Sequence, residues 1–195
     1  FGTPRANMTV GFLTPNGLLG AADRAQARLY QRLVNDALSA SIYPAYLAGL
    51  GYSIDVADSG FAISVNGYQD KQMTLLDTVA QKLLNAEIST DRFTTIKASL
   101  IKDWRNSRKD KPYVQALGAL NDTLLSASWS AETLADALEP ITVEGLLQWR
   151  FEQFQDVGVI AALHGNVTAS EAEQLHRFIN ETIKPKSVVR QRTRV

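Results

Sequence analysis

Histidine is a common zinc ligand in proteins, and this chain has two, His164 and His176. A zinc site built on one helix places its ligands at positions i and i+4, so that both imidazoles point the same way. The two histidines instead lie at the end of a predicted strand and inside a predicted helix. We expect His164 to hydrogen-bond locally at the strand end and His176 to lie on a solvated or half-buried helix face. Neither is expected to bind metal.

The other side chains that carry out enzyme chemistry are absent or wrongly spaced. The chain has no cysteine, which excludes disulfides, thiolate metal sites and cysteine nucleophiles. No serine lies in a Gly-x-Ser-x-Gly turn, which would expose a nucleophile. The Gly-x-Gly-x-x-Gly pattern that cradles phosphates is missing too. The residues therefore predict no catalytic, cofactor-binding or metal-binding site, and no cofactor held by this chain.

The charges are unevenly distributed along a chain of 20 basic and 20 acidic residues. Residues 184–195 hold five basic side chains and no acid, so residues 1–183 carry 15 basic and 20 acidic groups, a net charge of −5. An acidic body without basic patches among aromatic residues predicts no nucleic-acid partner. We interpret the basic tail as a solvated linker toward a following domain. A tail that binds an anionic partner is the alternative.

Two further features concern the setting of the protein. No stretch reaches the roughly 18 to 20 consecutive apolar residues of a membrane helix, so no membrane partner is expected. The first residues, Phe1 to Arg5, lack the basic-then-apolar layout of a signal peptide, and there is no initiator methionine. We therefore expect a piece of a longer protein, and the sequence leaves its compartment open between periplasm and cytoplasm.

The first third of the chain alternates between strand and helix patterns. Residues 7–13 read as a strand, and apolar side chains alternate on both arms of a predicted hairpin over residues 52–65. Between them, Asp23 is expected to cap a helix that runs to about Ser39. Pro44 should interrupt this helix, with the pattern resuming beyond it.

Helices dominate from residue 70 to about residue 154, and Ser130 and Thr142 are expected to cap two of them. Residues 157–163 form an almost wholly apolar run of strand length, so we predict a central strand there. Thr168 is expected to cap a last helix.

This element order predicts an α+β fold, with an antiparallel or mixed sheet and helices packed mainly on one face. The predicted organisation is a single domain over residues 1–183 followed by the linker or tail at residues 184–195.

Five short segments occur in a characteristic order and at characteristic intervals. They are Leu47–Tyr52, Gly67–Gln72, Arg92–Phe93 with Ile96–Lys97, Trp129–Ser130 and Leu163–Thr168. In this register they resemble the third of the four homologous domains of insulinase/pitrilysin-type zinc metallopeptidases. The resemblance covers about residues 1–183. It implies the fold of mitochondrial-processing-peptidase-like metallohydrolase domains.

The resemblance implies a clamshell peptidase that degrades peptides in a closed chamber. Its N-terminal half holds zinc with a His-x-x-Glu-His helix and a downstream glutamate, and its C-terminal half shares the fold without the metal. The first of these helices would correspond here to residues 23–39, and residues 21–51 contain no histidine. The second would correspond to residues 92–104, where Ser99 lies near the glutamate position.

We therefore expect a non-catalytic, substrate-enclosing domain of a zinc-dependent metalloendopeptidase, a hydrolase whose zinc is held elsewhere in the parent chain. The expected partners are the other domains of that chain and its peptide substrate. Self-association of the isolated chain is a further expectation, because surface normally covered by neighbouring domains would be exposed. Two alternatives stay open: a non-enzymatic binding module that uses the basic tail, and an enzyme of unknown type that uses His164.

Overall fold

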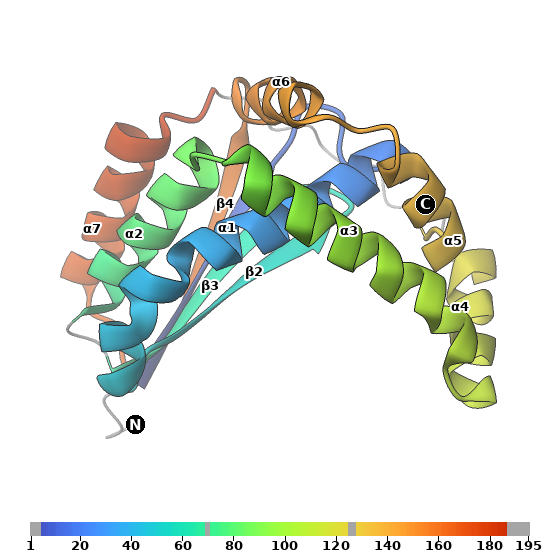
Figure 1. Cartoon of the computed structure of the whole chain (residues 1–195). Helices are drawn as coiled ribbons and strands as arrows, with labels where there is room; N and C mark the ends of the chain where they lie inside the picture. Colours follow the sequence, from blue (N-terminus) through green and yellow to red (C-terminus); the bar gives the residue numbers. More distant parts are fainter. Residues whose placement is uncertain (1–4, 69–70, 125–127, 187–195) are drawn as a thin grey trace.

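A computed structural model describes residues 5–68, 71–124 and 128–186 of the chain (Figure 1). Its strands form one antiparallel sheet in the order β2-β3-β1-β4. They are β1 (Arg5–Leu13), β2 (Gly51–Ala57), β3 (Gly60–Tyr68) and β4 (Gly158–Gly165). The tight turn between β2 and β3 confirms the predicted hairpin.

The helices lie together on one face of this sheet (Figure 1). They are α1 (Ala21–Leu47), α2 (Gln72–Asn85), α3 (Thr90–Asn106), α4 (Pro112–Leu124), α5 (Ala131–Leu138), α6 (Val143–Phe154) and α7 (Ala169–Phe178). A short 3-10 turn, Ser107–Lys109, follows α3, and a π turn, Ile179–Ile183, extends α7. The predicted α+β class with one-sided helices is confirmed. No helix among the described residues is long and apolar enough to cross a membrane.

The core lies between the helices and the inner face of the sheet. Alternate residues of β1, including Met8, Val10 and Phe12, are buried because successive side chains of a strand point to opposite faces. Aromatic rings from distant segments meet beside them, with Phe61 of β3 stacked on Phe154 of α6 at a centroid distance of 5.5 Å. The outer face of the sheet carries mainly small and polar residues.

Three predicted helix caps are present. The side chains of Ser130 and Thr142 each accept a hydrogen bond from a backbone N–H three residues on, at 3.1 Å. Thr168 forms a full capping box with Glu171, in which each residue binds the other's backbone N–H. These caps satisfy donors that the first turn of a helix leaves unpaired.

The prediction for the first helix was wrong in two respects. Gly20, not Asp23, is the N-cap of α1, and Asp23 instead accepts a hydrogen bond from the indole N–H of Trp149 at 3.0 Å. The helix also continues through Pro44 to Leu47. Proline removes one backbone donor and crowds the carbonyl four residues earlier. That carbonyl belongs to the exposed Ala40, where water can bind it.

The prediction of a central strand at residues 157–163 was wrong as well. β4 pairs with β1 and forms one edge of the described sheet. Of the predicted stretch, Val157 is buried, but Ile160 is 60% exposed. An apolar run predicts burial without revealing whether one strand or two will lie beside it.

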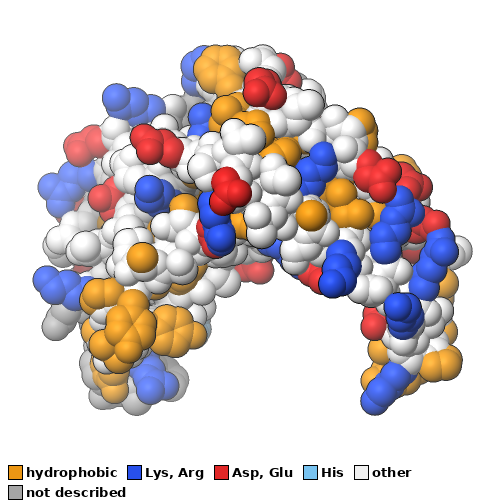
Figure 2. All heavy atoms as spheres, in the orientation of Figure 1, with side chains coloured by type: hydrophobic (Ala, Val, Ile, Leu, Met, Phe, Trp, Pro, Cys, Tyr) orange, Lys and Arg blue, Asp and Glu red, His pale blue; other side chains and the backbone are white. Residues whose placement is uncertain are grey.

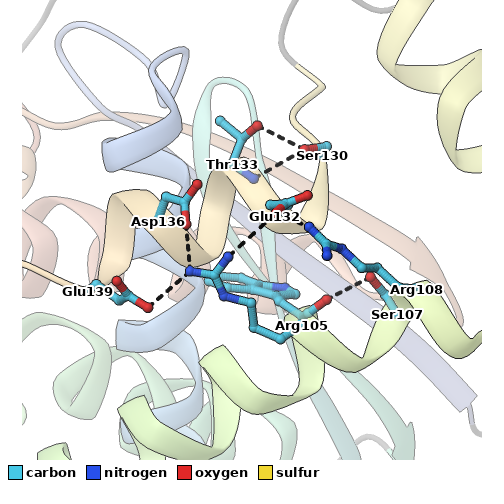
Figure 3. Close-up of polar contacts among 9 residues, drawn as sticks. Arg105, Ser107, Arg108, Ser130, Glu132, Thr133, Asp136 and Glu139 are labelled. Atoms are coloured by element: carbon cyan, nitrogen blue, oxygen red, sulfur yellow. Dashed lines mark hydrogen bonds and ion pairs between the residues drawn. The ribbon is translucent and has the colours of Figure 1, made fainter.

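The helices α3 and α5 are joined by polar contacts (Figure 3). One guanidinium nitrogen of Arg105 lies 2.5 Å from Asp136 and 3.0 Å from Glu139, while Arg108 pairs with Glu132. The hydrogen bonds that Arg105 donates to Glu139 and Asp136 raise its pKa. Arg105 therefore stays charged and links one face of α5 to the end of α3.

Candidate functional site

By the resemblance, the two zinc-binding helices of the catalytic domain correspond to α1 and α3 of this chain. The groove between α1 and α3 is therefore the first candidate site. It contains a hollow of about 290 Å³. Its lining residues are Arg32, Asn35, Asp36, Ile96 and Ser99. Ser99 therefore faces α1, as the expected position of a third ligand requires. The groove thus lies where the resemblance implies a metal site. Whether it can bind a metal depends on the ligand atoms that line it.

The carboxylates of this groove are paired with arginines. Arg92 binds both oxygens of Asp36, with its Nε 2.8 Å from Oδ2. Arg32 lies 2.8 Å from the carboxylate of Asp103 on the next turns of α3. Donating hydrogen bonds to Asp36 raises the pKa of Arg92, so the guanidinium holds its charge. The carboxylates of Asp36 and Asp103 are therefore paired with the guanidinium groups of the chain's own arginines.

An adjoining hollow of about 380 Å³ adds further positive charge. Its lining residues are Arg28, Gln31, Arg32, Leu100, Trp104 and Leu134. Partial burial, together with the charge of Arg24, lowers the pKa of Arg28, while Asp55 opposes the shift. The charges of Arg24 and Arg32, which lower this pKa less than burial does, make the local potential positive. Such a potential disfavours a divalent cation in this part of the groove.

The residues of the groove do not fit a zinc ion. Zinc in proteins takes three or four ligands drawn from histidine, cysteine and carboxylate side chains. The groove offers serine, asparagine and arginine-paired aspartates. Across the described parts of the chain, no group of three or more histidine, cysteine, aspartate or glutamate side chains lies close enough together to hold a metal.

The two histidines lie on the surface and outside this groove. His164 is on β4, opposite Asn7 of β1, and is exposed. Within the described residues its imidazole makes no hydrogen bond, so the local side-chain bond expected for it is absent. His176 lies on an exposed face of α7, as predicted, with Nδ2 of Asn180 3.0 Å from its Nε2.

The ion pairs of the groove were not foreseen from the sequence. Arg92 and Asp36 are 56 positions apart, and Arg32 and Asp103 are 71 apart. No local pattern links such pairs, because each depends on how α1 and α3 pack. The hairpin and the caps could be predicted because their signals lie within a few residues. The tail residues Arg190, Arg192 and Arg194 lie outside the described residues.

Sequence comparison places the chain in a family. The family described as the middle or third domain of peptidase_M16 matches residues 1–137, from the start of the chain through most of α5. The chain belongs to the M16 peptidase family. It corresponds to the middle domain, as the five segments indicated, and its relatives include insulinase-type metallopeptidases.

Named relatives agree with the M16 assignment. Insulin-degrading enzyme of Homo sapiens is 30% identical over 183 residues, which is 94% of this chain and 18% of the human protein. Insulin-degrading enzyme-like 1, peroxisomal, of Arabidopsis thaliana is 28% identical over 192 residues, or 97% of this chain and 20% of that protein. This M16 domain thus spans about a fifth of the length of these relatives.

Solved structures share the fold. The crystal structure of pitrilysin superposes with a TM-score of 0.86 at 19% identity, covering 94% of this chain and 20% of that one. A conserved protein from Enterococcus faecalis V583 gives a TM-score of 0.72 at 18% identity, covering 97% of this chain and half of that one. At such identities the likeness concerns the fold alone.

Proposed function

We propose that this M16 middle domain is a non-catalytic domain that helps to enclose the peptide substrate of a zinc-dependent metalloendopeptidase. In this proposal another part of the parent chain holds the zinc, polarises the scissile bond and activates water. The observation that carries the proposal is the donor set of the α1–α3 groove. Asp36 and Asp103 are paired there with arginines, and Ser99 lies near the position where the resemblance implies a glutamate.

The shape of the domain supports an enclosing role. No helix of the described residues packs on the outer face of the sheet, which carries small or polar side chains such as Thr9 and Ser64, whose hydroxyls lie 3.0 Å apart. Beyond α3, α4 projects from the rest of the molecule and leaves a deep concavity (Figure 2). The polar outer face of the sheet suits a wall that borders a chamber and holds peptides without binding them tightly.

Metal analysis tests the absence of a zinc site. The purified chain is stripped with a chelator, reloaded with zinc, washed and measured for metal and for hydrolysis of a fluorogenic peptide. We expect far less than one zinc per chain and no hydrolysis. A variant with both His164→Ala and His176→Ala is the matched control, because it removes weak zinc binding at exposed imidazoles. One tightly held zinc in the control as well as in the original chain would refute the proposal.

The enclosing role is tested in the full-length parent. A photo-crosslinking amino acid replaces Asn7 on the outer face of the sheet, and the control carries it at Lys102 on the exposed side of α3. With a labelled peptide substrate, we expect crosslinks from position 7 and few from position 102. Equal capture at both positions, or capture only from α3, would show that the sheet does not face the substrate.

A further inference from the structure

The hollow that adjoins the α1–α3 groove is bordered by three helices. The helix α5 contacts both α1 and α3 (Figure 1), and the hollow of about 380 Å³ is lined by residues of all three. Pockets that bind small molecules measure about 300–1,000 Å³, so a small organic ligand fits this one. Its lining is divided by chemistry. The helix α1 contributes Arg28, Gln31 and Arg32, and the other two helices contribute Leu100, Trp104 and Leu134.

Arg28 differs from the arginines on either side of it along α1. Arg24 and Arg32, four positions away in each direction, are each paired with an aspartate. Among the described residues, no carboxylate lies within ion-pair distance of Arg28. Its hydrogen bond runs from Nη1 to Oε1 of Gln31, at 3.4 Å. A guanidinium group has five N–H donors, so Arg28 keeps donors for a further acceptor.

The side chain of Gln31 links Arg28 to the sheet. Its Oε1 accepts the hydrogen bond from Arg28, while its Nε2 donates to the backbone carbonyl of Ile54 in β2. The amide is therefore fixed at one end by a strand and orients the guanidinium at the other. An oriented guanidinium loses less conformational freedom when it binds an anion.

The charges near Arg28 favour an anion. Burial is the largest cause of its lowered pKa, and the charges of Arg24 and Arg32 lower the pKa further. Asp55 opposes them, but its effect is smaller than that of Arg24 alone. Positive charge thus prevails at this end of the hollow, and an anion bound there would neutralise it.

We propose that this hollow binds a carboxylate that carries an apolar group. The two carboxylate oxygens pair with the guanidinium of Arg28, because the planar forks of the two groups match. The apolar group packs on Trp104 and on the two leucines of the hollow. Arg32 adds a second cation, one nitrogen of which is occupied by Asp103. The proposal goes beyond the proposed function, because the hollow lies among the helices and the proposed substrate wall is the outer face of the sheet.

A titration of the chain with phenylacetate, followed by nuclear magnetic resonance, tests the site. This probe joins a carboxylate to a phenyl ring, and the indole N–H of Trp104 reports on the hollow. We expect that signal to shift to saturation. The indole N–H groups of Trp129 and Trp149 are internal controls, because they donate to Leu19 and Asp23 outside the hollow. Phenylacetamide, which lacks the charge, and acetate, which lacks the ring, should each bind at least about tenfold more weakly.

Substitution of Arg28 assigns the charge requirement. Arg28→Met keeps the apolar stem and should weaken phenylacetate binding about tenfold or more, while Arg28→Lys should fall between the two. Arg177→Met removes an exposed arginine of α7 and should bind like the original chain. An unmoved Trp104 signal, equal binding of phenylacetamide, or full affinity in Arg28→Met would overturn the proposal. The comparison with phenylacetamide needs no variant, so it decides the matter even if Arg28→Met fails to fold.

The carboxylate has two possible sources, which the full-length parent distinguishes. One source is a free organic acid, and the other is an acidic side chain beside an apolar residue elsewhere in the parent. With a free acid as the ligand, equilibrium dialysis should show that the parent binds labelled phenylacetate and that Arg28→Met abolishes the binding. With an internal carboxylate, the parent should bind none, and Arg28→Met should lower its unfolding midpoint more than Arg177→Met does. A parent that shows neither behaviour would refute the site.

Discussion

Tyr30 combines a buried ring with a hydrogen bond to the backbone. Its side chain is fully buried, and its hydroxyl donates to the carbonyl oxygen of Leu83 at 2.6 Å. Burial raises the pKa of this phenol to about 12, because the phenolate would lose its solvation. In the unfolded chain the pKa is about 10. The folded state therefore favours the neutral phenol.

This difference predicts how stability depends on alkaline pH. The contribution of Tyr30 is complete below about pH 10 and is lost as the pH rises through about 12. Tyr30→Phe should cost roughly 1 kcal/mol near neutral pH, because the Leu83 carbonyl loses its donor. The variant should then lose less stability than the original chain between these two pH values. Urea unfolding at several pH values measures both effects.

The control for this prediction is Tyr113→Phe, since Tyr113 is an exposed tyrosine of α4. Its unfolding midpoint should follow that of the original chain at every pH. If Tyr30→Phe and the original chain declined in parallel above pH 10, the phenol would not be shielded as the structure indicates.

At the scale of single elements, Lys97 joins α3 to the end of α5. Its ammonium group donates to the carbonyl oxygens of Glu139 and Ile141, both at 2.7 Å. Carbonyls at a helix C-terminus lack partners within the helix, so a lysine there satisfies them and interacts favourably with the helix dipole. Lys97→Met keeps the apolar stem and removes both bonds. We expect a loss of roughly 1 kcal/mol in unfolding free energy.

Lys102→Met is the matched control, because Lys102 lies on the exposed side of the same helix. It should change the unfolding free energy by less than about 0.5 kcal/mol. Chemical denaturation of the three proteins measures the difference. A loss of equal size in both variants would mean that the charge of α3, and not the two carbonyl contacts, determines the effect.

The elements also differ in how far the sequence predicts them. The cap residues Ser130, Thr142 and Thr168 act on donors three residues away, so a local pattern was sufficient. The continuation of α1 through Pro44 was not predictable in this way. There Ile42 and Leu50 are buried on either side of the proline, and tertiary packing outweighs its local cost.

For the molecule as a whole, composition and periodicity predicted the α+β class but not the order of the strands. β4 has the apolar sequence that is typical of a central strand, but it lies at an edge of the described sheet. The residues of a strand do not determine how many strands lie beside it. The α1–α3 groove shows the same limit. The sequence could show that histidine is absent from α1, whereas the pairing of Arg92 with Asp36 follows from the packing of two helices.

Among the described helices, α4 has the least tertiary support. All of its 13 residues are exposed, and it projects away from the body of the domain (Figure 1). Its large apolar side chains are Tyr113, Val114, Leu117, Leu120 and Leu124. Isolated helices shorter than about 12–15 residues are marginally stable in water. We therefore expect α4 to open locally far more often than α1, whose inner face is buried.

Hydrogen exchange of backbone amides in the isolated chain measures this difference. Amides of α4 should exchange nearly as fast as unstructured ones, while those of α1 should exchange only through global unfolding. Leu117→Gln on α4 should change the unfolding free energy by less than about 0.5 kcal/mol. Leu76→Ala in the core of α2 should cost about 2–5 kcal/mol. If the amides of α4 were as protected as those of α1, the apolar side chains of α4 would have to be covered in solution. In this structure they are exposed.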